Sequence, residues 1–569
     1  MIIARHTNKT FPILTLASLL LTGVSAHAGT LAAKTDSFLA PKLTAPSASG
    51  WSSVILKTEG TLSAAQEARL VSLGADITRR LPFIHAVALR LPARNLRALA
   101  ALPFVVHLSA DGEVKKSDGF TEGASGEAAA FQQTGLTGQG VIVAVLDSGV
   151  ASSGDFDSRL YNVISFVPGD SSTNDTCGHG THVAGIIAGS GLNSTGPGFK
   201  HTFHGIARGT CIAGVRVLDQ YGAGTVSSVL AGIQYVVQTK QKYNYKLPVV
   251  MNLSLGHPVG ESYTTDPLCQ GVEAAWKAGI VVVCAAGNSG RANTGNKSGA
   301  ANEGWGTAYG SIQSPGNDPY VITVGATKNV DGNHAHDKIA TYSSRGPSRL
   351  DLILKPDIIA PGNKVISLNA PGSYLSTKYA VNDQVPLSYY SSTGSGLSAD
   401  YLQLSGTSMA APVVAGAAAL MLQKDPTLTP DTVKERLMVS ADKWAAPDAL
   451  GNAKGMADPC TYGAGYLNIP AALNCSLQAG GSALSPALTA DGTGKVSLDA
   501  SKIVSAQMHI IWGSTGLTDL HVIWGNSAFS DPTTLAASHV IWGSSVWSDH
   551  VIWGSSTDAV DLQTAAYGE

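Results

Sequence analysis

The sequence predicts an α/β fold in three layers, with helices on both faces of a central, mostly parallel sheet. Five almost wholly apolar stretches alternate with helical stretches along the main body of the chain. Strands that are apolar throughout are buried on both faces, which is typical of a parallel sheet between two layers of helices. At 569 residues the chain also exceeds the size of one hydrophobic core, so we expect further domains. The predicted strands are residues 141–147, 211–219, 249–256, 280–287 and 320–326.

The first 28 residues have the pattern of an export signal. Arg5 and Lys9 supply a positive start, an apolar run follows over residues 13–24, and Ala-His-Ala at 26–28 fits a cleavage site. The run is short for a membrane span, and no later stretch is long and apolar enough to cross a bilayer. We therefore expect cleavage after residue 28 and a mature protein that is secreted or associated with the cell surface.

Export bears on the six cysteines. An even number of cysteines in an oxidising compartment favours disulfides. Six cysteines allow fifteen pairings, however, so spacing alone leaves the assignment open. Spacing favours Cys460–Cys475, a helix-then-strand hairpin would bring Cys269 to Cys284, and Cys177 is then left with Cys211.

A small unit is expected over residues 51–120, after a linker at 29–50. Ser63 and Gln66 form a capping-box pattern that starts one helix, and Pro92 suits the first turn of a second. Strand-like stretches flank both helices. The order strand, helix, strand, strand, helix, strand is the ferredoxin-like plan.

The C-terminal region is expected to be a Gly/Ser/Ala-rich linker over residues 476–508 and a repeat-bearing β extension over 509–569. Each repeat, His-x-Ile-Trp-Gly, reads as one short strand and a glycine turn. We interpret the repeats as a small β structure with Trp and Ile in its core; binding to the cell envelope and metal binding through the histidines are the alternatives. The repeats begin at His509, His521, His539 and His550.

Three short stretches carry the parts of an activated nucleophile. Asp147 stands where an apolar strand ends, and His179 stands at a predicted helix start. Ser408 stands just before a long alanine-rich helix, with Pro412 expected in its first turn. Serine is a weak nucleophile at neutral pH, so a histidine must take its proton and a buried carboxylate must orient that histidine. Asp147, His179 and Ser408 are therefore the candidate orienting acid, general base and nucleophile.

Asn288 ends a fourth stretch, directly after the apolar strand at 280–287. Its side-chain amide could donate to a developing oxyanion, together with the backbone N–H of Ser408 at a helix N-terminus. The alternative is an ordinary turn residue, since Gly-Asn-Ser-Gly is a turn-prone sequence. We assign Asn288 the donor role.

The stretches that hold Asp147, His179, Asn288 and Ser408, in that order, closely resemble the motifs of the subtilisin-like serine peptidases, or subtilases. The resemblance covers essentially the whole main body, residues 121–475. It implies a subtilisin-like fold and a serine endopeptidase that hydrolyses peptide bonds through an acyl-enzyme, with no cofactor required for catalysis. Further blocks of the same family are residues 252–256, 343–348 and 355–362.

The resemblance also implies how substrate and propeptide bind. Residues 51–120 are similar to the family's inhibitory propeptide, which the enzyme itself removes, so a zymogen is expected. Two segments match the strands that pair with an extended peptide, and main-chain pairing of this kind accepts many sequences. One strand also walls the pocket for the residue before the cut bond. The matched residues are Ser254, Leu255 and Gly256 on that strand and Gly222, Ala223 and Gly224 on the opposite one.

The motif at 177–185 allows a second interpretation, a metal site. Cys177, His179 and His182 lie within six residues, and two histidines three apart can share a helix face. With His179 assigned as the base, we expect His182 to pack inside the helix and no catalytic metal. Structural calcium is common in the family and stays open here as a structural ion, although the loop at 189–204 matches no calcium-loop pattern.

The chain is longer between His179 and Ser408 than the compact members of the family. The additional residues lie near 293–313 and 366–403, which are polar stretches rich in Gly, Ser and Tyr. We expect loops there that shape or shield the cleft.

These features together predict an exported, self-processed serine endopeptidase whose partners are protein or peptide substrates and its own propeptide. A net charge of -3 and the absence of a basic run argue against a nucleic-acid partner. Two alternatives remain: a catalytically silent subtilase fold that only binds, and an adhesion role of the repeats. The complete set of catalytic residues argues against the first.

Overall fold

The computed structural model describes residues 34–44, 50–116, 134–242, 247–292, 306–328, 337–442, 458–490 and 496–498. The predicted export signal and the repeats lie outside these residues. No helix in the described ranges has the length and apolar character that a membrane span needs. The chain divides into two compact units, residues 1–111 and 112–569.

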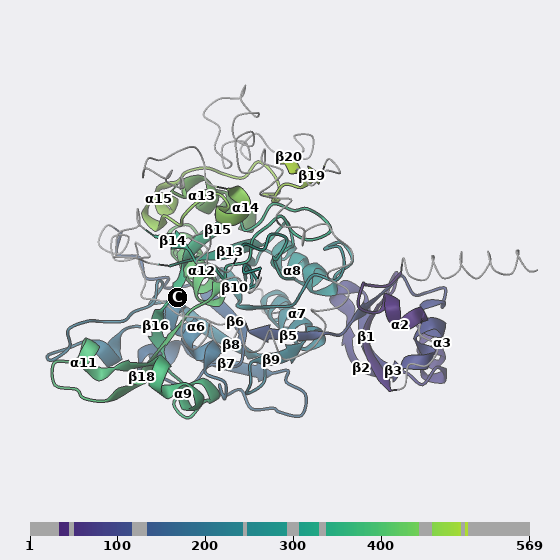
Figure 1. Ribbon diagram of the computed structural model, residues 1–569, viewed down its shortest axis with the longest axis horizontal. Helices are drawn as coiled ribbons and strands as arrows, with labels where there is room; N and C mark the ends of the chain where they lie inside the picture. Colours follow the sequence, from purple (N-terminus) through teal and green to yellow (C-terminus); the bar gives the residue numbers. More distant parts are fainter. Residues whose placement is uncertain are drawn as a thin grey trace, which may run out of the picture. The chain divides into compact units, whose positions relative to one another are not determined.

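Unit 1 has the predicted order of elements (Figure 1). Its sheet runs β2-β3-β1-β4, and every neighbouring pair is antiparallel, as in a ferredoxin-like fold. Ser63 caps α3 with both hydrogen bonds of the capping box to Gln66. The elements are β1 (Trp51–Lys57), α3 (Ala64–Ser72), β2 (Asp76–Leu81), β3 (Ala86–Pro92), α4 (Leu96–Ala100) and β4 (His107–Ala110).

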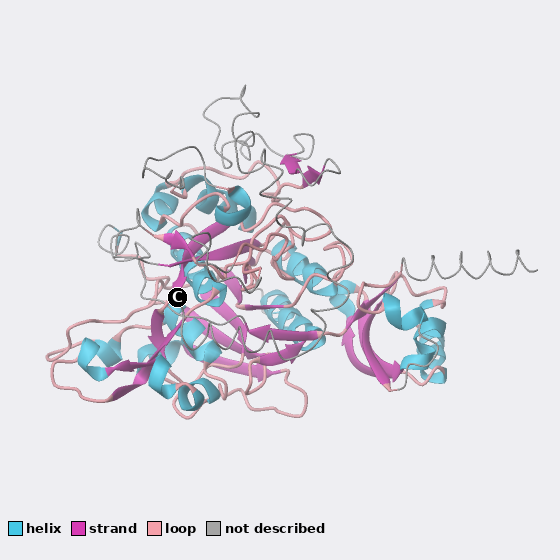
Figure 2. Ribbon diagram, viewed as in Figure 1, coloured by secondary structure: helices cyan, strands magenta, loops and turns pink. Residues whose placement is uncertain are grey.

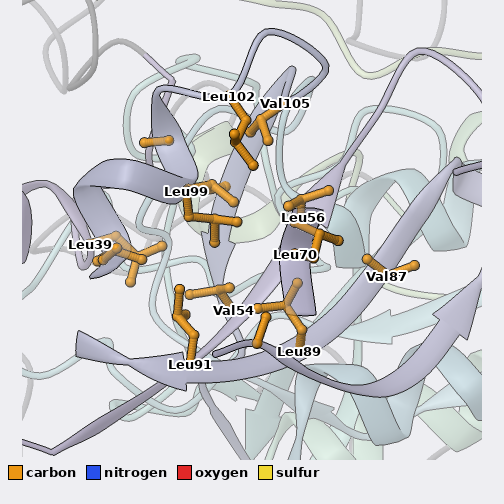
Figure 3. Close-up of a cluster of buried hydrophobic side chains, with 14 of the residues drawn as sticks. Leu39, Val54, Leu56, Leu70, Val87, Leu89, Leu91, Leu99, Leu102 and Val105 are labelled. Atoms are coloured by element: carbon orange, nitrogen blue, oxygen red, sulfur yellow. The ribbon is translucent and has the colours of Figure 1, made fainter. Parts of the chain in front are cut away.

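The core of unit 1 takes in part of the predicted linker at 29–50. Leu39 is 1% exposed and lies in one cluster with Val54, Leu91 and Leu99 (Figure 3). It stands directly before the short helix α2 (Ala40–Thr44), and the carboxylate of Asp36 accepts its N–H at 2.7 Å. Residues 34–44 are therefore part of the unit.

Unit 2 is built on the predicted mostly parallel sheet, in the order β14-β13-β12-β10-β6-β8-β7, with β15 also paired to β13. Among the described strands of this sheet, only the β13–β14 pair is antiparallel. The five predicted strands correspond to β6, β8, β10, β12 and β13. The strands are β6 (Ile142–Asp147), β7 (Leu160–Ser165), β8 (Cys211–Arg216), β10 (Val249–Leu253), β12 (Val281–Ala285), β13 (Ile322–Lys328), β14 (Lys338–Ile339) and β15 (Ile358–Asn363).

Helices cover both faces of this sheet, which confirms the three layers (Figure 2). On one face α12 (Thr407–Lys424) packs against the central strands and against α6 (His179–Ala188). On the other, α7 (Val226–Lys242) packs against α8 (Pro267–Lys277). Further helices of the main body are α13 (Pro430–Ser440), α14 (Pro459–Tyr462) and α15 (Ile469–Asn474).

The stretch 366–403, expected as a loop, is a small folded insertion. Its strands form an antiparallel sheet in the order β16-β18-β17. Tyr390 and Tyr401 are buried and meet edge to face at 5.4 Å, which gives the insertion an aromatic core of its own. The elements are β16 (Val365–Leu368), α9 (Tyr374–Lys378), α10 (Ala380–Asp383), β17 (Gln384–Pro386), α11 (Leu387–Tyr390) and β18 (Leu397–Leu404).

Residues 477–488, which we call the strap, are bound to unit 2 although the sequence suggested a linker. The N–H of Ser485 donates to Pro319 at 2.9 Å, and the carbonyl of Pro486 accepts the N–H of Leu354 at 2.8 Å. Leu488, the last strap residue, is 3% exposed and begins β19 (Leu488–Ala490), which pairs with β20 (Val496–Leu498). Alternating hydrogen bonds and buried side chains make the strap part of the main body.

The strap closes a buried ionic cluster. Lys355 Nζ lies 2.6 Å and Lys434 Nζ 3.5 Å from the carboxylate of Asp357, and all three side chains are fully buried. Ser485 donates its hydroxyl to the same carboxylate and accepts from Lys434 at 2.9 Å. Burial raises the pKa of Asp357, but the charges of the two lysines outweigh it and hold the pKa below its usual value.

Asp318 lies near this cluster and carries an unusual pKa. Its side chain is fully buried and accepts the N–H of Tyr320 at 2.8 Å. Burial, with a smaller contribution from the charge of Glu273, raises the pKa of Asp318 to about 8. The carboxyl is therefore protonated in the folded protein at pH values where the unfolded chain has released the proton.

This pKa predicts a pH dependence of stability. Asp318 contributes to the free energy of unfolding at about pH 4, and this contribution is lost as the pH rises to about 8. Asp318→Asn should remove that slope, so the variant should gain stability relative to its parent between about pH 5 and pH 8. Urea unfolding at several pH values measures this dependence of the free energy of unfolding, in a Ser408→Ala background that avoids autolysis. The control variant Asp400→Asn, which changes an exposed carboxyl, should keep the slope of the parent. An unchanged slope in the Asp318 variant would contradict the assignment.

The cysteines do not form the predicted disulfides. All six lie in the described part of the chain, and none is joined to another. Cys211 begins β8 opposite Ile142, whereas Cys177 lies beside Asp175 and Ser148, at the other end of the sheet. A six-residue strand spans about 16 Å, far beyond the reach of a disulfide. Cys269, for its part, donates its thiol to Asn317 at 3.3 Å.

Candidate active site

Asp147 and His179 meet at the carboxyl edge of the sheet. Asp147 is the last residue of β6, and His179 is the first of α6. His179 Nδ1 lies 2.8 Å from Asp147 Oδ1, and both side chains are at most 1% exposed. A buried carboxylate on Nδ1 orients the ring and leaves Nε2 as the proton acceptor.

A second carboxylate, Asp175, holds the loop that leads to His179. It is 3% exposed and accepts the hydroxyl of Ser148 at 2.9 Å and the N–H of Gly178 at 2.7 Å. Ser148 follows Asp147, and Gly178 precedes His179. Asp175 therefore ties the strand end with the acid to the helix start with the base.

The close approach of α6 to β6 depends on Gly180. A Cβ at this position would collide with the carbonyl oxygen of Gly149 and would lie 3.1 Å from the Asp147 Cβ. Any side chain here would push the helix away from the strand. The glycine next to His179 is thus required by the contact between His179 and Asp147.

Ser408 is the second residue of α12 and is fully buried. Its hydroxyl donates to the carbonyl of Ser254 at 3.1 Å, and the hydroxyl of Ser254 donates to the carbonyl of Ser408 at 2.8 Å. The helix begins at Thr407, so the expectation that Pro412 lies in its first turn is wrong; Pro412 lies inside the helix. Because proline has no N–H for the carbonyl four residues earlier, Ser254 supplies the hydrogen bond that the helix cannot.

Asn288 lies beyond β12 and contacts the start of α12. Its Oδ1 accepts both the N–H and the hydroxyl of Thr407, each at 3.1 Å. The Thr407 hydroxyl in turn accepts the N–H of Gly287 at 3.1 Å. Because Thr407 binds the oxygen of the Asn288 amide, the NH₂ group of that amide points away from Thr407 and can act as a hydrogen-bond donor.

The candidate residues come from adjacent strands. Asp147 ends β6, and Ser254 and Asn288 follow the carboxyl ends of β10 and β12; these three strands are neighbours in the sheet. In α/β sheets this edge is where ligands bind. The sheet order therefore gathers residues that are far apart in the chain.

The predicted substrate strands lie on either side of a third strand of the same chain. β5 (Glu113–Lys116) pairs antiparallel with β11 (Leu255–Gly256) and with β9 (Ala223–Thr225). Lys116 is opposite Leu255, and Lys115 is opposite both Gly256 and Ala223. β5 thus occupies the position that the sequence assigned to a bound extended peptide.

His182 is a packing residue, as expected. Its Nε2 lies 2.9 Å from the carbonyl oxygen of Val365 and 3.3 Å from that of Leu402. Burial, followed by the charge of His179, lowers the pKa of His182 to about 3. A neutral ring held by two carbonyls links α6 to the insertion.

A calcium site at the loop 189–204 does not fit the side chains there. Asp155, the acidic group beside it, accepts the N–H of Asn193 at 2.8 Å and of Gly191 at 3.2 Å, and the hydroxyl of Tyr401 at 3.3 Å. Its oxygens thus face N–H and O–H donors rather than a cation. Across the described ranges, no three His, Cys, Asp or Glu side chains gather as metal ligands.

Sequence reasoning missed two supporting residues, Asp175 and Thr407. An aspartate shortly before a predicted helix is a capping signal, so Asp175 could have been suspected. Thr407 carries no such signal, because its role depends on Asn288, which lies far away in the chain.

Comparisons with known proteins give a consistent picture. The model of the "Subtilase family" matches residues 138–465. Serine protease AprX of Bacillus subtilis (strain 168) is 38% identical over 337 residues, which cover 58% of this chain and 66% of AprX. Subtilisin DY of Bacillus licheniformis is 34% identical over 341 residues, which cover 60% of this chain and 93% of the relative.

A solved structure shares the fold. The crystal structure of fervidolysin from Fervidobacterium pennivorans, "a keratinolytic enzyme related to subtilisin", matches with a TM-score of 0.55 at 22% identity. The match covers 75% of this chain and 62% of fervidolysin. The chain therefore spans slightly under two thirds of both AprX and fervidolysin.

Proposed function

Because the chain belongs to the subtilase family, whose domain is that of a serine-type endopeptidase, we propose that it is an exported endopeptidase made as a self-processed zymogen. The observation that carries this proposal is the buried pair of Asp147 and His179 at the sheet edge where Ser254 holds the Ser408 hydroxyl, with β5 between the two substrate strands. Export rests on the signal pattern of residues 1–28.

The residues have the following roles in peptide hydrolysis. The Ser408 hydroxyl turns from the Ser254 carbonyl, gives its proton to His179 Nε2 and attacks the peptide carbonyl. Asp147 holds Nδ1 and stabilises the imidazolium that forms. The amide of Asn288 and the N–H of Ser408 donate to the oxyanion. His179 then protonates the leaving amine, and water releases the acyl group from Ser408.

Subtilases need no cofactor for catalysis, and this proposal uses none. All proton transfers run through His179, and all charge stabilisation comes from backbone and side-chain groups. Structural calcium has no part in it.

The register of β5 supports a proposal for the position of the first cut. Lys116 lies opposite Leu255, so a peptide continuing in the same register brings its next residue level with Ser254, whose carbonyl holds the Ser408 hydroxyl. The attacked carbonyl is then that of residue 117. We infer that the precursor is cut between Ser117 and Asp118, within the expected boundary of the propeptide.

Mapping the new N-terminus tests this proposal. Precursor refolded from denaturant should release a fragment that begins at Asp118, as intact mass and N-terminal sequencing would show. The Ser408→Ala precursor, treated identically, should stay whole. A wild-type precursor that never cuts itself would favour a silent binding module, and cutting that persists in the Ser408 variant would point to another nucleophile.

A further inference from the structure

We propose that Tyr374 of the insertion and Tyr221 form an aromatic wall for one substrate side chain, that of the second residue before the cut bond. We further propose that the mature enzyme prefers a large apolar residue at this second position. The inference rests on the proposed function and adds a preference made by residues outside the catalytic set.

The register of β5 identifies the second position. In this register the peptide residue opposite Ser254 is the one directly before the cut bond. The preceding peptide residue is opposite Leu255, and it is therefore the second residue before the cut. On the other side Lys115 is opposite Ala223, so the residue opposite Leu255 lies beside Gly222. Tyr221 precedes Gly222 in the turn that leads into β9, outside the strand alternation, and this places it next to the second position.

Tyr221 and Tyr374 are in contact across this border. Their rings meet edge to face, with centroids 5.3 Å apart and planes at 85°. Tyr221 is 58% exposed, and Tyr374 is half-buried. Two solvent-facing aromatic rings in this arrangement offer apolar surface to a neighbouring side chain.

The helix that carries Tyr374 is fixed to the catalytic loop. The N–H of Tyr374 donates to the carbonyl of Thr176 at 2.9 Å, and that of Leu375 donates to Cys177 at 3.0 Å. Both acceptors lie in the loop that ends at His179. The wall is therefore anchored to the element that holds the general base, although it comes from the insertion.

Lys378 and Tyr379 also contact the Tyr374 ring. Its Nζ lies 4.8 Å from the centre of the Tyr374 ring and 5.5 Å from that of Tyr379, and it donates to the Tyr374 hydroxyl. Tyr379 also meets Tyr374 edge to face at 6.4 Å. Tyr374 is thus held by several contacts before any substrate binds.

Strand geometry explains why the second position meets this wall. Successive side chains of an extended peptide point to opposite faces. The first side chain enters the pocket walled by residues 254–256, so the second points to the opposite face. We assign to that face Tyr374, which is bound to the loop before His179 and contacts Tyr221, so that an apolar side chain there would be shielded from water.

Peptide libraries that vary only the second position test the inference. With the mature wild-type enzyme, kcat/KM for peptides with Phe or Leu should exceed that for Gly by about tenfold. Tyr374→Ala, which keeps the backbone N–H that binds Thr176, should reduce this ratio to about one and leave the Gly peptide nearly unaffected. Tyr374→Phe should keep the ratio, because the ring remains.

Tyr389→Ala is the matched control, since Tyr389 is an exposed tyrosine of the same insertion that stacks on His201 instead. It should retain the wild-type ratio. An unchanged Phe-to-Gly ratio in a Tyr374→Ala enzyme that still cuts the Gly peptide would overturn the inference and leave the proposed function standing. Absence of cleavage of every peptide by the wild type would overturn both.

Discussion

Replacing Ser408 or His179 with alanine is expected to lower the first-order rate of self-cleavage by about 10⁶, and replacing both should cost no more than either alone. This magnitude is the one known for a subtilisin. The reason is that the nucleophile and base act as one unit: without the base the hydroxyl keeps its proton, and without the hydroxyl the base has nothing to activate. Asp147→Ala should cost less, about 10⁴.

Self-cleavage of refolded precursors measures these effects without an added substrate. Each variant should unfold at the parent's temperature, which separates loss of chemistry from loss of fold. If the two single losses instead multiplied in the double variant, Ser408 and His179 would act independently, and the triad mechanism would be wrong.

Ending the chain after residue 475 should destabilise the main body by about 4 kcal/mol or more, whereas ending it after residue 490 should have little effect. The shorter form loses the hydrogen bond from Ser485 to the buried Asp357, worth about 1.5–3 kcal/mol. It also loses the burial of Leu488, worth about 2 kcal/mol. Lys434 would lose its contact with Ser485 and stay buried near an incompletely bonded carboxylate.

Urea unfolding of both truncated forms, made in the Ser408→Ala background, checks this prediction. Ser485→Ala in the longer form isolates the hydroxyl and should cost about 2 kcal/mol. Equal stability of the two truncated forms would show that residues 476–490 are a linker, as the sequence suggested.

The sheet and the candidate catalytic residues could be predicted because their signals are local. The continuous apolar strands identify the parallel sheet. Asp147, His179 and Ser408 each lie in a short motif whose neighbouring residues indicate a strand end or a helix start. The order of elements in unit 1 could also be predicted from local signals. Ser63 and Gln66, for example, mark the start of a helix within four residues.

The features that were missed depend on partners distant in the chain. Ser254 was expected only on the substrate strand; the bond from its hydroxyl to the Ser408 carbonyl was missed, because it depends on Pro412, which removes an N–H from α12. The strap is rich in small residues and therefore looked like a linker, yet its hydroxyls and backbone match polar groups of the main body. The disulfide predictions failed for the same reason. The number of cysteines and their spacing in the chain do not tell which of them lie close together in the fold.

The most direct test of the central claim is to label the mature protein with a fluorophosphonate and to identify the modified residue by peptide mass spectrometry. We predict a single modified residue, Ser408, in the mature wild-type protein. A mature, folded protein that takes up no label at Ser408, or is labelled at a different serine, would contradict the account.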